Sequence, residues 1–155
     1  MPSEIDQYLE ILNGTRKILL DAVASIPDEK FSWSPGLAAS SAEAILQHIG
    51  AWESRYVSVI VHSDGRSTDR TILTVKGKKN LVEKVEQIRA QTLQVIQKLK
   101  STDLDSLRPY DNTQRTVRHM LLRLLRHEYY HTGQINYIYL LLNPKAIGEA
   151  VPPPS

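Results

Sequence analysis

Three of the five histidines fall on the apolar stripes of two predicted helices, where their side chains would face neighbouring helices. His127 and His131 are four residues apart, so in a helix they project from one face, about 5–6 Å apart at Cβ. His48 takes the corresponding place on an earlier segment, one turn before Trp52. Burying three imidazoles in an apolar interior is costly unless each ring finds a polar partner. A divalent metal would be a partner shared by all three, and the spacing therefore predicts a metal site.

Imidazoles from two facing helices can converge on one ion, because packed helices lie about 8–10 Å apart and metal–nitrogen bonds are about 2.0–2.1 Å long. Three protein ligands with one open position are typical of a catalytic metal centre, whereas a structural zinc site is normally closed by four ligands. An all-imidazole set suits zinc, nickel, copper or iron, and the sequence does not choose among them. The alternative is a non-catalytic bundle in which the histidines have a structural role.

Residues 127–131 (HEYYH) also fit the H-E-x-x-H signature of zinc peptidases, in which the glutamate is the general base. A peptidase of this kind needs a further ligand downstream, and the candidate is Glu149. That residue lies beyond Pro144 in a tail that ends in prolines, and the chain offers almost no strand to align a peptide. We therefore expect Glu128 to act as a base beside the metal water, or to hydrogen-bond an imidazole.

Four segments carry apolar residues at helical spacing. The first opens with a predicted capping pair, Ser3 and Asp6, and must stop before Pro27, since proline disfavours helix at the residue before it. The second covers about residues 40–61, with Glu43 completing a capping box at its start.

The third and fourth segments span about residues 81–100 and 116–142. Between the second and third lies a polar run, residues 62–80, whose apolar patch at residues 71–75 is interpreted as loop because it has no strand partner. Four helices of roughly 20–27 residues with little strand signal predict an all-α fold, a four-helix bundle.

The chain of 155 residues fits one domain, with residues 1–143 as the helical bundle and residues 144–155 as a non-helical, proline-rich tail. It has no cysteine, which excludes disulfides, thiolate metal cages and a cysteine nucleophile. A net charge of +2 with scattered basic residues argues against nucleic acid as a partner. No run reaches the ~18 apolar residues of a membrane span, and the acidic start lacks a signal-peptide pattern. We expect a cytoplasmic protein that acts on a small-molecule substrate and binds neither membrane nor nucleic acid.

Two stretches of the chain resemble the DinB/YfiT-like superfamily of metalloenzymes. The first comprises residues 31–36 (FSWSPG) and 41–48 (SAEAILQH), at the entry to the second helix. The second is residues 127–135 (HEYYHTGQI) on the last helix. The match extends over nearly the whole chain apart from about the last ten residues. Its most specific part is the final-helix string combined with one histidine on the second helix.

The resemblance implies a four-helix bundle of the DinB/YfiT-like type in which three histidines hold a divalent metal, often zinc or nickel. Those histidines correspond to His48, His127 and His131. It also implies a homodimer and, from relatives such as bacillithiol S-transferases and mycothiol-dependent maleylpyruvate isomerase, a reaction that uses a low-molecular-weight thiol. We therefore expect thiol-dependent S-transfer, or a related reaction, on a small electrophile. Hydrolysis of a small substrate with Glu128 as base, and a non-catalytic metal-binding bundle, stay open as alternatives.

Overall fold

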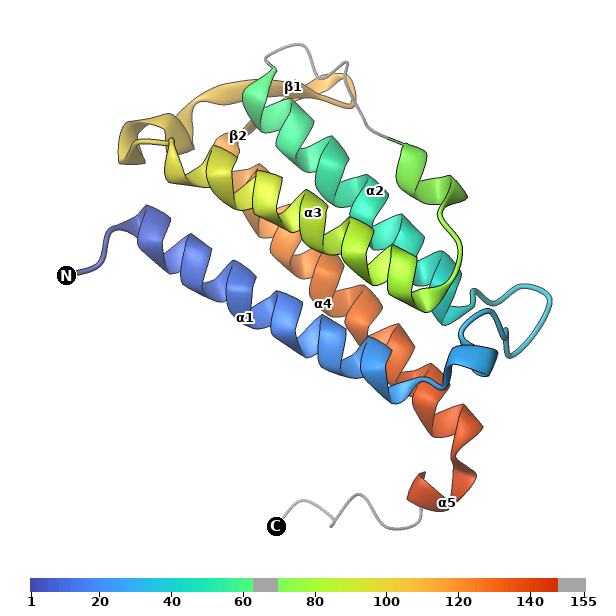
Figure 1. Ribbon diagram of the computed structural model, residues 1–155. Coiled ribbons are helices and arrows are strands. Elements are labelled where there is room, and N and C mark those ends of the chain that lie inside the picture. Colours follow the sequence, from blue (N-terminus) through green and yellow to red (C-terminus); the bar gives the residue numbers. More distant parts are fainter. Residues whose placement is uncertain (63–69, 148–155) are drawn as a thin grey trace.

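Four long helices form a bundle in the computed structural model (Figure 1), which describes residues 1–62 and 70–147. These helices are α1 (Glu4–Ser25), α2 (Ala42–Val61), α3 (Lys78–Gln97) and α4 (Val117–Leu142). The predicted all-α bundle is confirmed. No helix in the described ranges is both long enough and apolar enough to cross a membrane.

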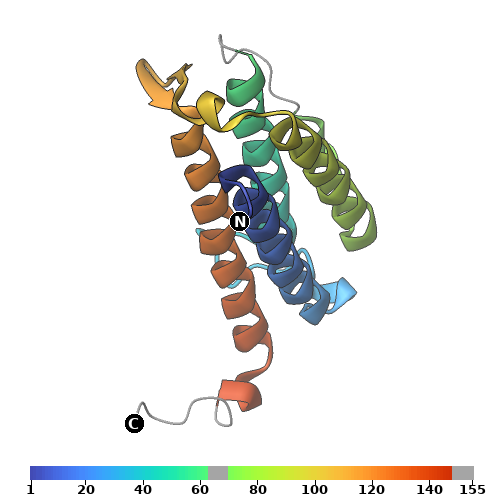
Figure 2. The same cartoon turned by 90° about the vertical axis from the view of Figure 1, so that its left-hand side faces the viewer.

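The helices are arranged so that each of α3 and α4 packs against both α1 and α2, which places α1 diagonally across from α2. α2 and α3 begin at the same end of the bundle, where the Gly77 N–H donates to Glu43 Oε1 over 2.9 Å, and they run parallel. α1 and α4 run in the opposite direction (Figures 1 and 2). The lengths of the connections in the sequence could not decide this order.

Side-chain caps determine where the first two helices begin. Ser3 Oγ accepts from the Asp6 N–H at 3.1 Å, and the Asp6 carboxylate accepts from the Ser3 N–H at 2.9 Å, so the predicted capping pair is confirmed. The N-cap of α2 is Ser41, one residue after the predicted start at residue 40, and its hydroxyl accepts from the Ala44 N–H. The Glu43 carboxylate does not complete a capping box and instead binds the segment that leads into α3.

A β-hairpin precedes α4, in the segment that separates the third predicted helix from the fourth. Strands β1 (Leu107–Tyr110) and β2 (Thr113–Thr116) pair antiparallel. Asp111 and Asn112 connect them with φ of 45° and 60°, the left-handed region that a two-residue hairpin turn needs and that Asp and Asn tolerate. The sequence signal was this Asp-Asn pair between two short polar strands, without the alternating apolar pattern that usually reveals a strand.

Three 3-10 helices and a final short helix complete the described chain. They are η1 (Asp28–Lys30), η2 (Thr71–Thr74), η3 (Ser101–Asp105) and α5 (Pro144–Ile147). η2 replaces the loop predicted for residues 71–75. α5 corrects the prediction of a tail that is non-helical from residue 144, because proline is accepted at the first position of a helix, where its missing N–H is not needed. Residues 148–155, the rest of the predicted tail, lie outside the described residues.

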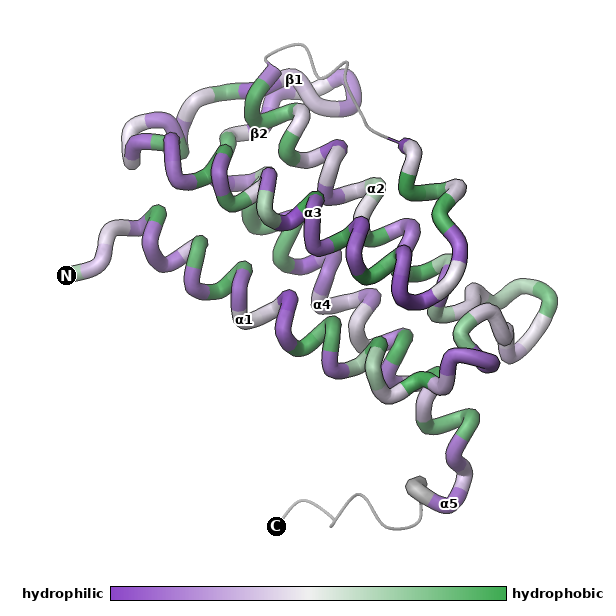
Figure 3. Tube along the Cα trace, viewed as in Figure 1, coloured by the Kyte–Doolittle hydropathy of each residue, from purple (hydrophilic) through white to green (hydrophobic). Residues whose placement is uncertain are grey.

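Apolar side chains, most of them from the four long helices, form two buried clusters, one toward each end of the bundle. Hydrophobic and hydrophilic residues alternate along every helix, as Figure 3 shows. Phe31 is a member of the first cluster, and Trp33 packs against it. The largest fully buried members are Leu19, Ile26, Leu46, Ile49, Ile72 and Leu81 in the first cluster and Leu12, Ile96, Leu104, Met120, Leu121 and Leu124 in the second.

Gly50 lies where α2 approaches α3 and η2 closely. A Cβ added at Gly50 would lie 3.2 Å from Val85 Cγ1 and would clash with Ile72 Cδ1. Gly50→Ala should therefore lower the free energy of unfolding by about 1–3 kcal/mol through overpacking. Gly14 in α1 has open space around it, so Gly14→Ala should raise that free energy by up to about 1 kcal/mol through helix propensity. Urea denaturation measures both effects, and an equal gain at the two positions would contradict the close approach.

Candidate metal centre

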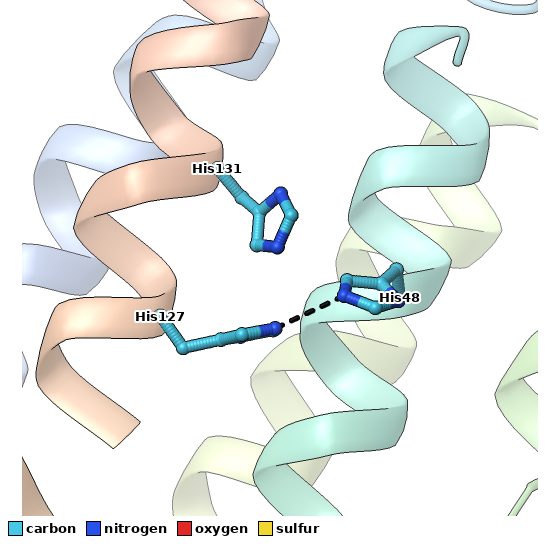
Figure 4. A group of neighbouring side chains, drawn as sticks. All are labelled: His48, His127 and His131. Atoms are coloured by element: carbon cyan, nitrogen blue, oxygen red, sulfur yellow. Dashed lines mark hydrogen bonds between the residues drawn. The ribbon is translucent and has the colours of Figure 1, made fainter. Parts of the chain in front are cut away.

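The three histidines singled out by their spacing converge in the groove between two helices. His48 projects from α2, and His127 and His131 project from α4 toward it (Figure 4). One ring nitrogen from each lies within 4.8 Å of the others, and the Nε2 atoms of His48 and His127 are 3.0 Å apart. Bonds of about 2.0–2.1 Å at tetrahedral angles would separate such nitrogens by roughly 3.3 Å. The observed separations, 3.0 Å for one pair and within 4.8 Å for all three, lie on either side of that value.

The surroundings keep two of the rings neutral at physiological pH. Burial, followed by the proximity of His131, His48 and Arg123, lowers the pKa of His127 to about 3. Burial and the proximity of His131 also lower the pKa of His48. Metal ligation requires the neutral imidazole, whose free lone pair binds the ion. The residues therefore fit a divalent cation without any prior loss of protons from these two rings.

Gln134 orients the third ring. Its Oε1 lies 2.6 Å from Nδ1 of His131. An amide oxygen only accepts hydrogen bonds, so Nδ1 is the donor of this bond and Nε2 is the nitrogen left for a metal. Ligating histidines typically have such a partner on the nitrogen that does not bind the metal. Gln134 was not assigned to the site from the sequence, although its position three residues after His131 was a usable signal.

The imidazoles line a surface cavity of about 370 Å³. All three rings are half-buried, which differs from the enclosed position that the apolar stripes predicted. A small molecule could therefore reach them without unfolding the bundle. The other side chains that line the cavity are Trp52, Tyr56, Arg123, Arg126 and Tyr130.

Glu128 points away from this cavity into the centre of the bundle. It is 1% exposed, and its Oε2 accepts hydrogen bonds from Arg16 at 2.8 Å and from Arg89 at 2.6 Å. Successive residues of a helix are rotated by about 100°, so Glu128 and His127 face different sides of α4. The position of Glu128 thus corrects the expectation that it acts as a base beside the metal. Glu149, the further ligand of the peptidase interpretation, lies outside the described residues.

Glu128 belongs to a polar layer that takes one charged residue from each long helix, namely Arg16, Glu53, Arg89 and Glu128. Glu53 is fully buried and accepts from Arg16 at 2.5 Å and from Arg89 at 2.7 Å. Burial by itself would raise the pKa of Glu53, but the two guanidinium groups more than offset it and hold that pKa below its usual value. The layer contains two positive and two negative side chains and is electrically neutral.

The other three members of this layer were not predicted from the sequence. A signal was present, because Arg16 lies on the apolar stripe of α1, four residues after Leu12 and three residues before Leu19. Glu53 interrupts the stripe of α2 in the same way. A charged residue on a core-facing stripe is expected to have a buried partner of opposite charge. Which residue that partner is depends on how the helices pair.

A sequence comparison identifies the family of the chain. The profile of the DinB superfamily matches residues 11–135. The chain belongs to the DinB superfamily. The family resemblance inferred from residues 31–48 and 127–135 is therefore confirmed. No curated protein matches the chain at a significant level.

Solved structures show the same fold as this member of the DinB superfamily. A DinB-like protein from Bacillus subtilis is 18% identical with a TM-score of 0.72, covering 88% of this chain and 91% of that one. A DinB-like protein from Bacillus cereus is 12% identical with a TM-score of 0.70, covering 87% and 89%. A conserved protein from Enterococcus faecalis is 15% identical with a TM-score of 0.74, covering 91% and 98%. At these identities the likeness establishes the fold.

Replacing Glu128 by glutamine should destabilise the bundle. The change leaves two buried guanidinium groups facing one carboxylate, and loss of one partner from a buried ion pair costs about 3–5 kcal/mol. Urea denaturation of the metal-free protein should show this loss, whereas Glu10→Gln on the exposed side of α1 should change stability by less than about 0.5 kcal/mol. Unchanged stability combined with a loss of activity would instead support a role for Glu128 as a base.

Proposed function

We propose that this DinB-superfamily protein is an enzyme that depends on a divalent metal, zinc or nickel, held by His48, His127 and His131. The observation that carries the proposal is the convergence of the three ring nitrogens, all within 4.8 Å, at the wall of a cavity that a small molecule can enter. When bound, the cation would lower the pKa of a coordinated thiol or water so that it becomes a nucleophile near neutral pH. The protein's own contribution is to keep the rings of His48 and His127 neutral and, through Gln134, to orient His131.

Transfer of a low-molecular-weight thiol to a small electrophile is the reaction that we propose for this cavity. The sulfur forms a bond to an electrophilic carbon, the leaving group of that carbon departs with its electron pair, and the thiol proton passes to solvent. A free thiol has a pKa of about 8.5, so a modest lowering of this pKa by the cation would be enough to ionise the thiol near neutral pH. Trp52, Tyr56 and Tyr130 offer aromatic surface to the organic part of the substrate.

Hydrolysis of a small substrate is supported less well. It would need a general base within hydrogen-bond reach of the attacking water. Among the described residues that line the cavity there is no carboxylate, and Glu128 is paired with two arginines inside the bundle. Glu128, the general base that the sequence offered for hydrolysis, therefore lies on the side of α4 that faces away from the cavity.

The proposed site predicts about one metal ion per chain in protein purified without a histidine tag. Elemental analysis should find none in the His48→Ala/His131→Ala variant and an unchanged content in His62→Ala, because His62 is exposed and does not line this cavity. Gln134→Leu should bind the metal about 10–100-fold more weakly, since it removes the partner of His131. Absence of metal from both the parent and the double variant would overturn the proposal.

The metal-loaded protein should accelerate the reaction of monochlorobimane with a small thiol, tested as cysteine, glutathione and bacillithiol. The chain has no cysteine, so the protein itself contributes no thiol background to this fluorescence assay. The His48→Ala/His131→Ala variant should give only the uncatalysed rate. Thiol-independent cleavage of a chromogenic ester would favour the hydrolase instead. Unfolding on metal removal without either reaction would favour a non-catalytic bundle.

A further inference from the structure

Positive charge is not balanced around the three-histidine cavity. Arg123 and Arg126 line it beside the imidazoles, and no acidic side chain of the described residues does. A divalent cation on neutral imidazoles would add two positive charges, and a thiolate would offset only one. Like charges repel across a few ångströms more strongly near protein than in bulk water, because the effective dielectric constant is lower. An additional anionic group would relieve this imbalance.

Arg123 has aromatic neighbours where a carboxylate would be expected. Its guanidinium carbon lies 5.1 Å from the ring centre of Tyr110 and 5.9 Å from that of Tyr56. Asp111, the acidic residue nearby in the hairpin turn, pairs with Arg55 at 2.5 Å. Burial acts to lower the pKa of Arg123, but the Tyr56 hydroxyl and Tyr110 more than offset it, so the pKa lies above its usual value and the group stays charged.

Arg126 follows three residues later and lies on the same side of α4, since residues three apart in a helix are neighbours. Its side chain is exposed and borders the same cavity. No residue in the described part of the chain forms an ion pair or hydrogen bond with it. Two guanidinium groups at this spacing destabilise the isolated helix slightly by mutual repulsion, which a shared anion would reverse.

We propose that Arg123 and Arg126 form an oxyanion-binding subsite, so that the substrate of the three-histidine centre is a small molecule with a carboxylate or phosphate group. The inference rests on the proposed function, because it takes this cavity as the place where the substrate binds. A guanidinium group recognises either anion through two parallel N–H donors, which gives orientation as well as affinity. With the anion held at the arginines, the organic part of the molecule lies against Trp52 and Tyr130, within reach of the imidazoles.

Simple anions test the subsite without an assay for the reaction. The chain has two tryptophans, Trp33 and Trp52, and only Trp52 lines the cavity. The fluorescence of the zinc-loaded Trp33→Phe protein therefore reports on the cavity. Benzoate and phenylphosphonate should each change this signal saturably, and benzamide, which has a similar size but no charge, should bind about tenfold more weakly. Comparison of the two anions shows whether the substrate group is a carboxylate or a phosphate.

Charge-removing variants locate the binding site. Arg126→Gln and Arg123→Gln should each weaken the preferred anion about tenfold with unchanged zinc content. Arg115→Gln, which removes an exposed arginine of β2 outside the cavity, should have no effect. Because Arg126 is exposed, its variant stays informative even if Arg123→Gln unfolds through loss of the tyrosine contacts.

Two results would overturn the subsite. One is equal affinity of the parent and Arg126→Gln for the anion. The other is complete loss of anion binding by the parent protein when zinc is removed with EDTA, since the anion would then be bound by the metal rather than by the arginines. A protein that binds zinc but does not prefer anions contradicts the subsite alone, whereas a protein without zinc contradicts the proposed function.

Discussion

Four buried charges, one from each long helix, constrain the rotation and the relative height of every helix in this bundle. Arg16, Glu53, Arg89 and Glu128 pair with one another in the observed arrangement, and a shift that separated them would leave an uncompensated charge in the interior at a cost of several kcal/mol. The apolar clusters on either side do not impose one rotation and height on each helix, because hydrophobic side chains of suitable size can repack at a smaller cost in stability than an unpaired buried charge. The polar layer thus selects one packing among those that the apolar stripes would permit.

The rotation of α4 about its axis decides which of its side chains reach the cavity, because the consecutive residues His127 and Glu128 face different sides of this helix. Glu128 faces the centre of the bundle and pairs with the arginines of α1 and α3, so its neighbour His127 must face the groove toward α2. His131 follows one turn later on the same side, and Gln134 holds its ring. The geometry of the candidate metal centre is therefore linked to the ion pairs of the core through a single helix.

The two sides of α4 also differ in charge. The polar layer is neutral and closed to solvent, whereas the cavity contains imidazoles and arginines and is open. A site of the second kind favours anionic ligands and nucleophiles, and a thiolate is one of them. Since the chain has no cysteine, a sulfur nucleophile would have to be supplied by a small molecule that enters this cavity.

The sequence by itself determined the four helices, the three candidate histidines and the DinB superfamily, since these follow from local spacing and from a string of residue types. Residues four apart share a helix face whatever surrounds them, so the spacing of His127 and His131 is enough to pair them. Only the tertiary structure decided that α2 and α3 run parallel, that Glu128 belongs to the core, and that Arg123 borders the cavity. The physical reason is that a buried charge is placed by its partner, and the partners of Glu128 lie 112 and 39 residues away along the chain.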